Sequence, residues 1–315
     1  MPASTTVSAP VTLTSASSSG AAVSPARKDA PVSARQKKKD KKKKKDKLKP
    51  GGLTAATSDR HILYEKSVQE PEAECDLVEK VWREQHTREC RVIREDFSGT
   101  SQVCMEWVKR DSGNRAIGVD LDRDVLDWAR ERLTERLNDD QRGRVSLIEG
   151  DVLATETERV DSVLAMNFSY YLFRTRDELR DYFRAVLGTL KDDGLFLLDA
   201  YGGSDAFSEI EEPRELDGFT YIWEQASYNP IDGSATNYIH FEFPDGTRID
   251  RAFEYIWRLW TLPEIRELLA EAGFSNVAVY WEGTDEDTDE GNGEFDETEV
   301  GEACEGWVAY LVARP

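Results

Sequence analysis

The chain has 315 residues, 39% of them hydrophobic, and a formal net charge of −21 at pH 7. This length and apolar content suffice for one large domain with appendages, and the absence of an apolar run near twenty residues excludes a membrane-spanning helix. The N-terminus lacks a charged start followed by an apolar block, so we expect no secretory signal. The four cysteines form no Cys-x-x-Cys pair, which favours reduced thiols in a cytoplasmic protein without a metal site.

The charge is divided unevenly along the chain. Residues 1–60 carry 14 Lys or Arg and four acids, a net charge of +10, and the remainder has a net charge of −31. The acidic body is therefore a poor candidate for nucleic-acid binding, which depends on neutralising phosphates. Residues 1–59 are of low complexity and contain a lysine-rich block at 37–45, so we expect a disordered tail. Either the tail binds an anionic partner weakly, such as RNA, a membrane surface or an acidic protein, or it only solubilises the body; both remain open.

Folded sequence is expected over residues 60–315, beginning with a helix over 72–85. Apolar runs of strand type then alternate with helical patterns, which predicts an α/β fold. The expected strands are 91–95, 115–120, 145–149, 160–166 and 194–200, and the expected helices are 101–110, 123–137 and 176–190. A helix over 262–272 and strands over 277–281 and 306–312 close the chain.

The turn after the first strand is the most informative segment. Asp96-Phe97-Ser98-Gly99-Thr100-Ser101 joins a strand to a helix, and Gly99 lets backbone approach a ligand beside the unpaired N–H groups of the helix N-terminus. About twenty residues later the second strand ends in Asp120, a position that suits a ribose diol. The third strand ends before Asp151, and the fourth runs into Asn167. Acid and amide groups should thus meet at one edge of the sheet.

These residues resemble class I S-adenosylmethionine (SAM)-dependent methyltransferases, in a variant carrying Arg94-Glu95-Asp96-Phe97-Ser98-Gly99-Thr100. The resemblance runs roughly from Arg60 to the C-terminus. It implies a Rossmann-like sheet that is mostly parallel, with an antiparallel C-terminal strand, and SAM as cofactor. The usual turn has three glycines, and here Phe97 and Ser101 occupy the outer two positions.

The resemblance also implies roles for individual residues. An acid, Glu95 or Asp96, would hold the methionine and ribose parts of SAM together with Gly99, while Asp120 would take both ribose hydroxyls and Asp151 the adenine amino group. Tyr64 and Gln69 either touch the methionine end or pack on the sheet edge. The full set of expected cofactor-binding residues is Tyr64, Arg94, Glu95, Asp96, Gly99, Asp120, Leu121, Asp151, Val152 and Asn167.

Residues 201–259 form an insertion that a plain sheet does not need. Alternating runs at 219–224, 238–243 and 249–258 predict three antiparallel strands, a small sheet or lid that selects the acceptor. Ten aromatic residues lie here or at the fourth-strand exit. Some should wall a pocket, and well over half should be core; they are Tyr170, Tyr171, Phe173, Tyr201, Tyr221, Trp223, Tyr228, Tyr238, Trp257 and Trp260.

Methyl transfer needs alignment, exclusion of water and, for some acceptors, removal of a proton, so no fixed catalytic triad is required. Tyr170 is the expected catalytic contact on the acceptor side. His240 is either a general base or a structural histidine. Asn167-Phe168-Ser169-Tyr170 keeps the ends, but neither proline, of the Asn-Pro-Pro-Tyr motif typical of enzymes that methylate planar amines. Nucleic-acid bases are therefore disfavoured as acceptors.

Residues 283–305 form an acidic loop: from Glu282 to Glu305 there are twelve acids and no Lys or Arg. Asp285, Asp287 and Asp289 have the spacing of a calcium loop, but Glu290 and Asp296 occupy the positions that need Gly and Glu. We therefore expect a solvated acidic hairpin rather than a calcium site.

The sequence thus predicts a SAM-dependent methyltransferase that acts on a small molecule, with amines among the candidate acceptors. One alternative is a non-catalytic protein that binds SAM or a nucleotide. Another is a nicotinamide-dependent oxidoreductase, which the absence of Gly-x-Gly-x-x-Gly disfavours.

Overall fold

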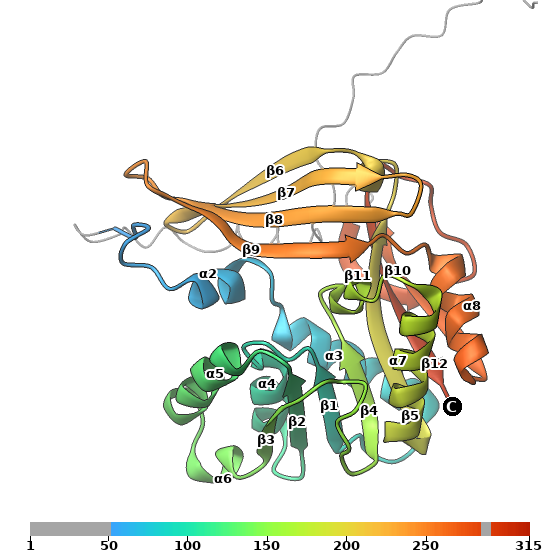
Figure 1. Ribbon diagram of the computed structural model, residues 1–315. Helices are drawn as coiled ribbons and strands as arrows, with labels where there is room; N and C mark the ends of the chain where they lie inside the picture. Colours follow the sequence, from blue (N-terminus) through green and yellow to red (C-terminus); the bar gives the residue numbers. More distant parts are fainter. Residues whose placement is uncertain (1–51, 285–290) are drawn as a thin grey trace, which may run out of the picture.

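The computed structural model describes residues 52–284 and 291–315. Its centre is an eight-stranded sheet in the order β11-β10-β12-β5-β4-β1-β2-β3 (Figure 1). Neighbours from β1 to β5 pair in parallel, whereas β12 is antiparallel to β5 and β10. The predicted Rossmann-like methyltransferase sheet is confirmed. The strands are β1 (Val92–Asp96), β2 (Arg115–Asp120), β3 (Val145–Glu149), β4 (Val160–Ala165), β5 (Leu190–Gly202), β10 (Asn276–Thr284), β11 (Gly291–Glu297) and β12 (Trp307–Arg314).

Helices cover both faces of this sheet. One apolar core joins it to α3 (Pro71–Gln85), α4 (Gln102–Arg110) and α5 (Arg123–Arg136), and the other joins it to α7 (Arg176–Thr189) and α8 (Leu262–Ala272). Side chains alternate across a strand, so Leu195 and Leu197 of β5 face the first core while Phe196 and Leu198 face the second. Both faces are buried, which explains the continuous apolar run in β5. The short α6 (Asp139–Arg142) leads to β3.

The insertion forms a separate four-stranded antiparallel sheet, which lies across the carboxyl ends of the parallel strands (Figure 1). Its strands are β6 (Ile210–Leu216), β7 (Phe219–Asn229), β8 (Ser234–Glu242) and β9 (Arg248–Arg258). The sequence predicted three of them. β6 was missed because Ile-Glu-Glu-Pro-Arg-Glu-Leu contains a proline and few apolar residues, which an edge strand tolerates.

The body begins earlier than the predicted boundary at residue 60. The backbone N–H of Ala55 donates to Oγ1 of Thr247 at 3.0 Å, and Asp59 accepts a 2.7 Å hydrogen bond from Nε1 of Trp128. Asp59 also caps α2 (Arg60–Ser67), a helix whose Leu63 packs against the small sheet. Disorder was predicted for residues 1–59, and residues 1–51 of that segment lie outside the described residues.

Part of the acidic loop pairs with the main sheet. β11 runs antiparallel to β10, with Trp281 opposite Asp296. Residues 285–290, and with them the aspartates of the calcium-like spacing, lie outside the described residues. None of the helices within 52–284 and 291–315 is long and apolar enough to cross a membrane.

Candidate active site

The turn between β1 and α4 has an unusual backbone conformation. Phe97, Gly99 and Ser101 all have φ between 49° and 58°, in the left-handed region that favours glycine. Phe97 and Ser101 therefore keep the conformation expected of the glycines that they replace. A side chain at Gly99 would meet no atom closer than 3.9 Å, so the turn is open there to a ligand. Strained backbone of this kind gathers at functional sites.

Asp120 at the end of β2 is fixed against this turn. Its two carboxylate oxygens accept hydrogen bonds from the N–H groups of Gly99, at 2.7 Å, and Asp122, at 2.9 Å. Each oxygen keeps a second lone pair for a ribose hydroxyl. The neighbouring Leu121 is 73% exposed and offers an apolar surface to an adenine ring. The turn and Asp120 therefore fit the ribose and adenine of SAM.

The third strand leads into the remaining adenine-side residues. Asp151 is exposed and accepts from the N–H of Leu153 at 2.9 Å, whereas Val152 is buried. β2 and β3 pair with Asp120 opposite Glu149, which brings Asp120 and Asp151 to the same edge of the sheet. Both residues remain proposed cofactor contacts.

Strand alternation separates Glu95 from Asp96. Asp96 is buried on the α7 face, where it accepts from Nε of Arg94 at 2.7 Å and from the hydroxyl of Tyr182 at 3.0 Å. Glu95 faces α4 and accepts from the N–H of Cys104 at 3.1 Å. Arg94 and Asp96 thus form an internal ion pair that stabilises the strand, and Glu95 is the acid that we propose for the methionine end.

The turn at residues 97–101 and Asp120 form one side of the proposed cofactor cradle, and the loop after β4, at Asn167 and Phe168, forms the other. Asn167 and Phe168 have φ of 59° and 57°, and their N–H groups donate to the carboxylate of Asp199 at 2.8 and 2.9 Å. Asp199 lies on β5 and is 7% exposed. Burial raises the pKa of Asp199 to about 7, although these two hydrogen bonds oppose the shift. Asp199 is not distinguished by any sequence motif, because it stands inside an apolar strand.

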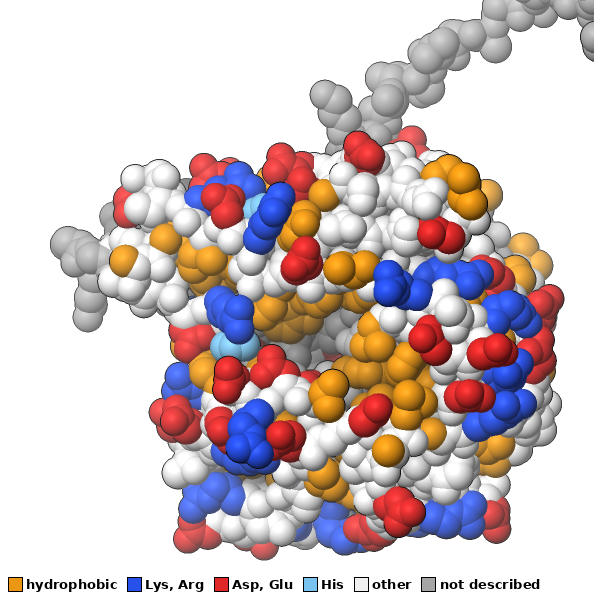
Figure 2. Space-filling view, viewed as in Figure 1, with side chains coloured by type: hydrophobic (Ala, Val, Ile, Leu, Met, Phe, Trp, Pro, Cys, Tyr) orange, Lys and Arg blue, Asp and Glu red, His pale blue; other side chains and the backbone are white. Residues whose placement is uncertain are grey.

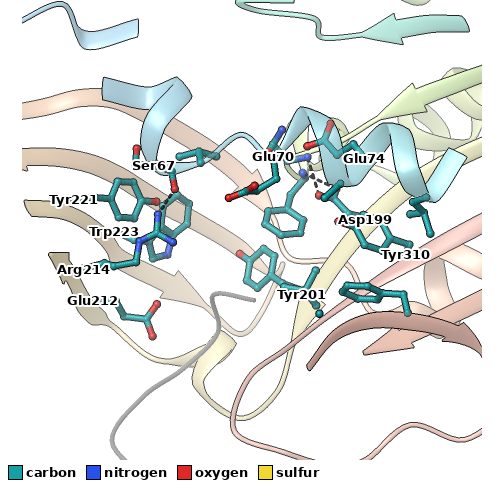
Figure 3. Close-up of a pocket in the computed structure, with 18 of the residues that line it drawn as sticks. Ser67, Glu70, Glu74, Asp199, Tyr201, Glu212, Arg214, Tyr221, Trp223 and Tyr310 are labelled. Atoms are coloured by element: carbon teal, nitrogen blue, oxygen red, sulfur yellow. Dashed lines mark hydrogen bonds between the residues drawn. The ribbon is translucent and has the colours of Figure 1, made fainter. Parts of the chain in front are cut away.

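A cavity of about 570 Å³ lies between the small sheet and the main sheet. Figure 2 shows a hollow lined by hydrophobic side chains between these two parts. Asn167, Phe168 and Asp199 line the end next to the cofactor cradle, and Tyr64 of α2 also lines the cavity. Figure 3 places Glu74 and Asp199 at one end, and Tyr221, Trp223 and Arg214 at the other.

Four of the ten aromatic residues highlighted by sequence line this cavity: Tyr201, Tyr221, Trp223 and Trp257. Tyr255 of β9 also lines it and was missed. The other six pack in the core or on the small sheet, in line with the expectation that most are structural.

Tyr170 and His240, the two expected catalytic residues, lie away from the cavity. Tyr170 is fully buried, and its hydroxyl donates to the carbonyl oxygen of Asp199 at 2.7 Å. His240 pairs across β7 with Ile222, whereas the cavity-lining Tyr221 and Trp223 alternate to the opposite face. Its ring nitrogens contact Glu224 at 2.8 Å and Asp250 at 3.3 Å. We therefore assign both side chains structural roles.

Comparisons with known proteins agree with this geometry. Residues 97–198 match a family described as "Methyltransferase domain". A search of the curated proteins finds none whose sequence matches this chain. The chain thus carries a methyltransferase domain over residues 97–198, and its fold is that of the SAM-dependent methyltransferases.

Three solved structures illustrate the likeness of the fold. A SAM-dependent methyltransferase from Clostridium acetobutylicum has a TM-score of 0.59 at 18% identity, covering 81% of this chain and 97% of the other. A SAM-bound amino pentose methyltransferase from Micromonospora echinaspora has a TM-score of 0.57 at 16% identity, covering 81% of this chain and 96% of the other. A sugar N-methyltransferase from Streptoalloteichus has a TM-score of 0.55 at 17% identity, covering 86% of this chain and 98% of the other.

Proposed function

We propose that this protein transfers the methyl group of SAM to an amine nitrogen of a small molecule bound in the cavity. The supporting observation is the combination of aromatic walls, among them Trp223 and Trp257, with carboxyl groups at the cofactor end. Ring faces and carboxylates both attract an ammonium group. A cavity of about 570 Å³ is of the size that holds a small metabolite.

Two of the fold neighbours support the same acceptor chemistry by analogy. By their names, one methylates an amino pentose and the other is a sugar N-methyltransferase. A shared fold does not specify the acceptor, so the proposal of an amine rests on the residues that line the cavity.

The chain's own residues would act by orientation, shielding and proton removal. When bound, SAM supplies a methyl group on a positively charged sulfur. Asp120 holds the ribose, and the walls of the cavity exclude water and aim the acceptor nitrogen along the line of displacement. An amine attacks only after it has lost its proton. Asp199, whose pKa burial raises to about 7, is placed to accept that proton near neutral pH.

A screen with labelled SAM tests the proposal. Small primary and secondary amines are compared with alcohols, phenols and carboxylic acids of matched shape. Transfer of label to amines only is the expected result, and exclusive labelling of phenols or carboxylates would contradict the amine assignment. SAM binding without turnover on any acceptor would favour the non-catalytic alternative.

A further inference from the structure

Glu74 carries a buried oxygen that the proposed chemistry does not use. It projects from the first turns of α3 and lines the cavity, with only 5% of the residue exposed. Within the described part of the chain, its Oε2 atom has no hydrogen-bond partner. An unpartnered carboxyl oxygen in a buried site is costly unless a ligand compensates it.

The carboxyl groups of Glu95 and Asp199 lie near enough to Glu74 to affect its pKa. Burial raises the pKa of Glu74 to about 8, and the neighbouring charges of Glu95 and Asp199 add to the shift. Glu95 accepts from the backbone of Cys104, and Asp199 from that of Asn167 and Phe168. Both acids thus accept from neutral groups. Three cations line the same cavity but contact other partners: Lys80 pairs with Asp296, Arg83 pairs with Glu79, and Arg214 donates to the carbonyl oxygen of Ser67.

These acids connect the cofactor cradle to the acceptor cavity. The charge of Asp120 raises the pKa of Glu95, and the charges of Glu95 and Asp199 raise the pKa of Glu74. Tyr64 lines the same cavity, and the charges of Glu74, Asp199 and Asp120 add to the effect of burial in raising the pKa of its hydroxyl. Glu74 and Asp199 lie at one end of the cavity (Figure 3). A cofactor whose ribose is held by Asp120 and whose methyl group reaches the cavity would have its sulfur near that end.

We propose that Glu74, flanked by Glu95 and Asp199, is a binding site for the positively charged sulfonium end of SAM, and that it makes the protein prefer SAM over S-adenosylhomocysteine. The product has lost both the methyl group and the charge on sulfur, so it loses this attraction while keeping every other contact. The inference rests on the SAM-dependent part of the proposed function and not on the amine acceptor.

The preference should depend on pH in a defined direction. The pKa of Glu74 is raised to about 8 and those of Glu95 and Asp199 to about 7, so the free site gains negative charge as pH rises from about 6 to 9. A cation favours the ionised carboxylates, so the preference for SAM should grow over this interval and SAM binding should release protons. Burial keeps Tyr64, Cys75, Cys104 and Tyr255 neutral by raising their pKa. The acidic and basic side chains that also line the cavity are Glu70, Asp76, Lys80, Arg83, Asp205, Glu212, Arg214 and Glu294.

Titration calorimetry on the full chain tests the inference with SAM and S-adenosylhomocysteine as the two probes. Both probes carry the same α-amino group, so the ratio of their dissociation constants isolates the sulfonium. Wild type should prefer SAM by about tenfold or more near pH 8, and by clearly less near pH 6. Repeating the SAM titration in buffers of different ionisation enthalpy measures the proton release.

Glu74→Gln should remove most of this preference while leaving affinity for S-adenosylhomocysteine within about twofold. The variant should fold normally, because it removes a charge whose Oε2 atom has no partner in the described structure. Glu72→Gln is the matched control: it removes the same charge from the exposed side of the same helix and should keep the full preference.

Three results would overturn the inference. Equal affinity of wild type for the two probes at every pH would mean that the acids do not sense the sulfonium. Equal weakening of both probes by Glu74→Gln would place Glu74 at the shared methionine ammonium instead. Failure of wild type to bind either probe would also remove the cofactor assignment, whereas tight SAM binding without turnover would affect only the proposed acceptor.

Discussion

Asp120 is the single side chain on which cofactor affinity should depend most. Its carboxylate is already oriented by the N–H groups of Gly99 and Asp122, so it meets the ribose without reorganisation. Charged hydrogen bonds of this kind contribute about 1.5–3 kcal/mol each. Asp120→Ala should therefore weaken SAM binding by about ten- to a hundredfold in calorimetry. Asp124→Ala, an exposed acid on α5, is the control, and unchanged affinity in folded Asp120→Ala would remove the assignment.

Tyr170 should matter for stability rather than for turnover. Its buried hydroxyl donates to the Asp199 carbonyl, and Tyr170→Phe removes that bond while keeping the ring. The expected loss is about 1 kcal/mol in the free energy of unfolding, measured by urea denaturation. Methyl transfer by the folded variant should stay close to wild type. A large fall in kcat with unchanged stability would instead return Tyr170 to the acceptor site.

Among the secondary-structure elements, β4 is tied to its neighbours by a buried acid at the edge of the sheet opposite the site. Asp161 is fully buried and contacts Arg88 at 2.6 Å, Lys191 at 2.8 Å and the N–H of Val92 at 2.8 Å. Asp161→Asn should lower the free energy of unfolding by about 1.5–3 kcal/mol, because it weakens charged hydrogen bonds to Arg88 and Lys191, whose side chains are 40% and 39% exposed. SAM affinity at a temperature where the variant is folded should be unchanged.

The same acid gives a pH dependence of stability. Burial alone would raise the pKa of Asp161, but hydrogen bonds from Lys191, Val92 and Arg88 hold it below its ordinary value. A carboxyl with a lowered pKa stabilises the fold above its unfolded pKa of about 4, and this stability is lost as pH falls through the folded value. Wild type should therefore lose more stability than Asp161→Asn on acidification below about pH 4.

The small sheet should determine acceptor binding and have little effect on SAM binding. Trp223 and Trp257 line the cavity from β7 and β9, with ring centres 5.8 Å apart. Trp223→Ala and Trp257→Ala should each lower kcat/KM for the acceptor by about tenfold or more, with the SAM dissociation constant within about twofold of wild type. Tyr228→Ala is the matched control, since this aromatic residue of β7 packs against Phe207. Equal loss of SAM affinity in the Trp variants would move the acceptor site elsewhere.

At the scale of the whole molecule, residues 1–51 should be dispensable for the methyltransferase body. They carry 13 Lys or Arg and three acids, and have a net charge of +10. The contacts of Ala55 and Asp59 survive a cut after residue 51. The truncated chain should keep its melting temperature within about 2 °C and its SAM affinity within about twofold. A larger drop that high salt abolishes would show that the basic segment docks on the acidic body.

The order of strands and helices was predictable because hydrophobic periodicity and turn residues are local signals. Strands β1 to β5 and helices α3, α4, α5, α7 and α8 fall within a few residues of their expected positions, apart from a longer β5. α2 and β6 were not predicted. α2 is short and gains its stability by packing Leu63 on the small sheet, a contact with residues far along the chain.

The sequence by itself determined the class of protein: a run of strand ends bearing Gly99, Asp120, Asp151 and Asn167 specifies a cofactor edge, because parallel strands end on the same side of a sheet. Only the tertiary structure decided which acids face a ligand. Because successive side chains of β1 point to opposite faces of the sheet, Asp96 contacts Arg94 and Tyr182, whereas Glu95 faces α4. Glu74, Glu95 and Asp199 come from a helix and two strands far apart in sequence. Their proximity, and the pKa shifts that follow from shared burial, arise only when those elements pack together.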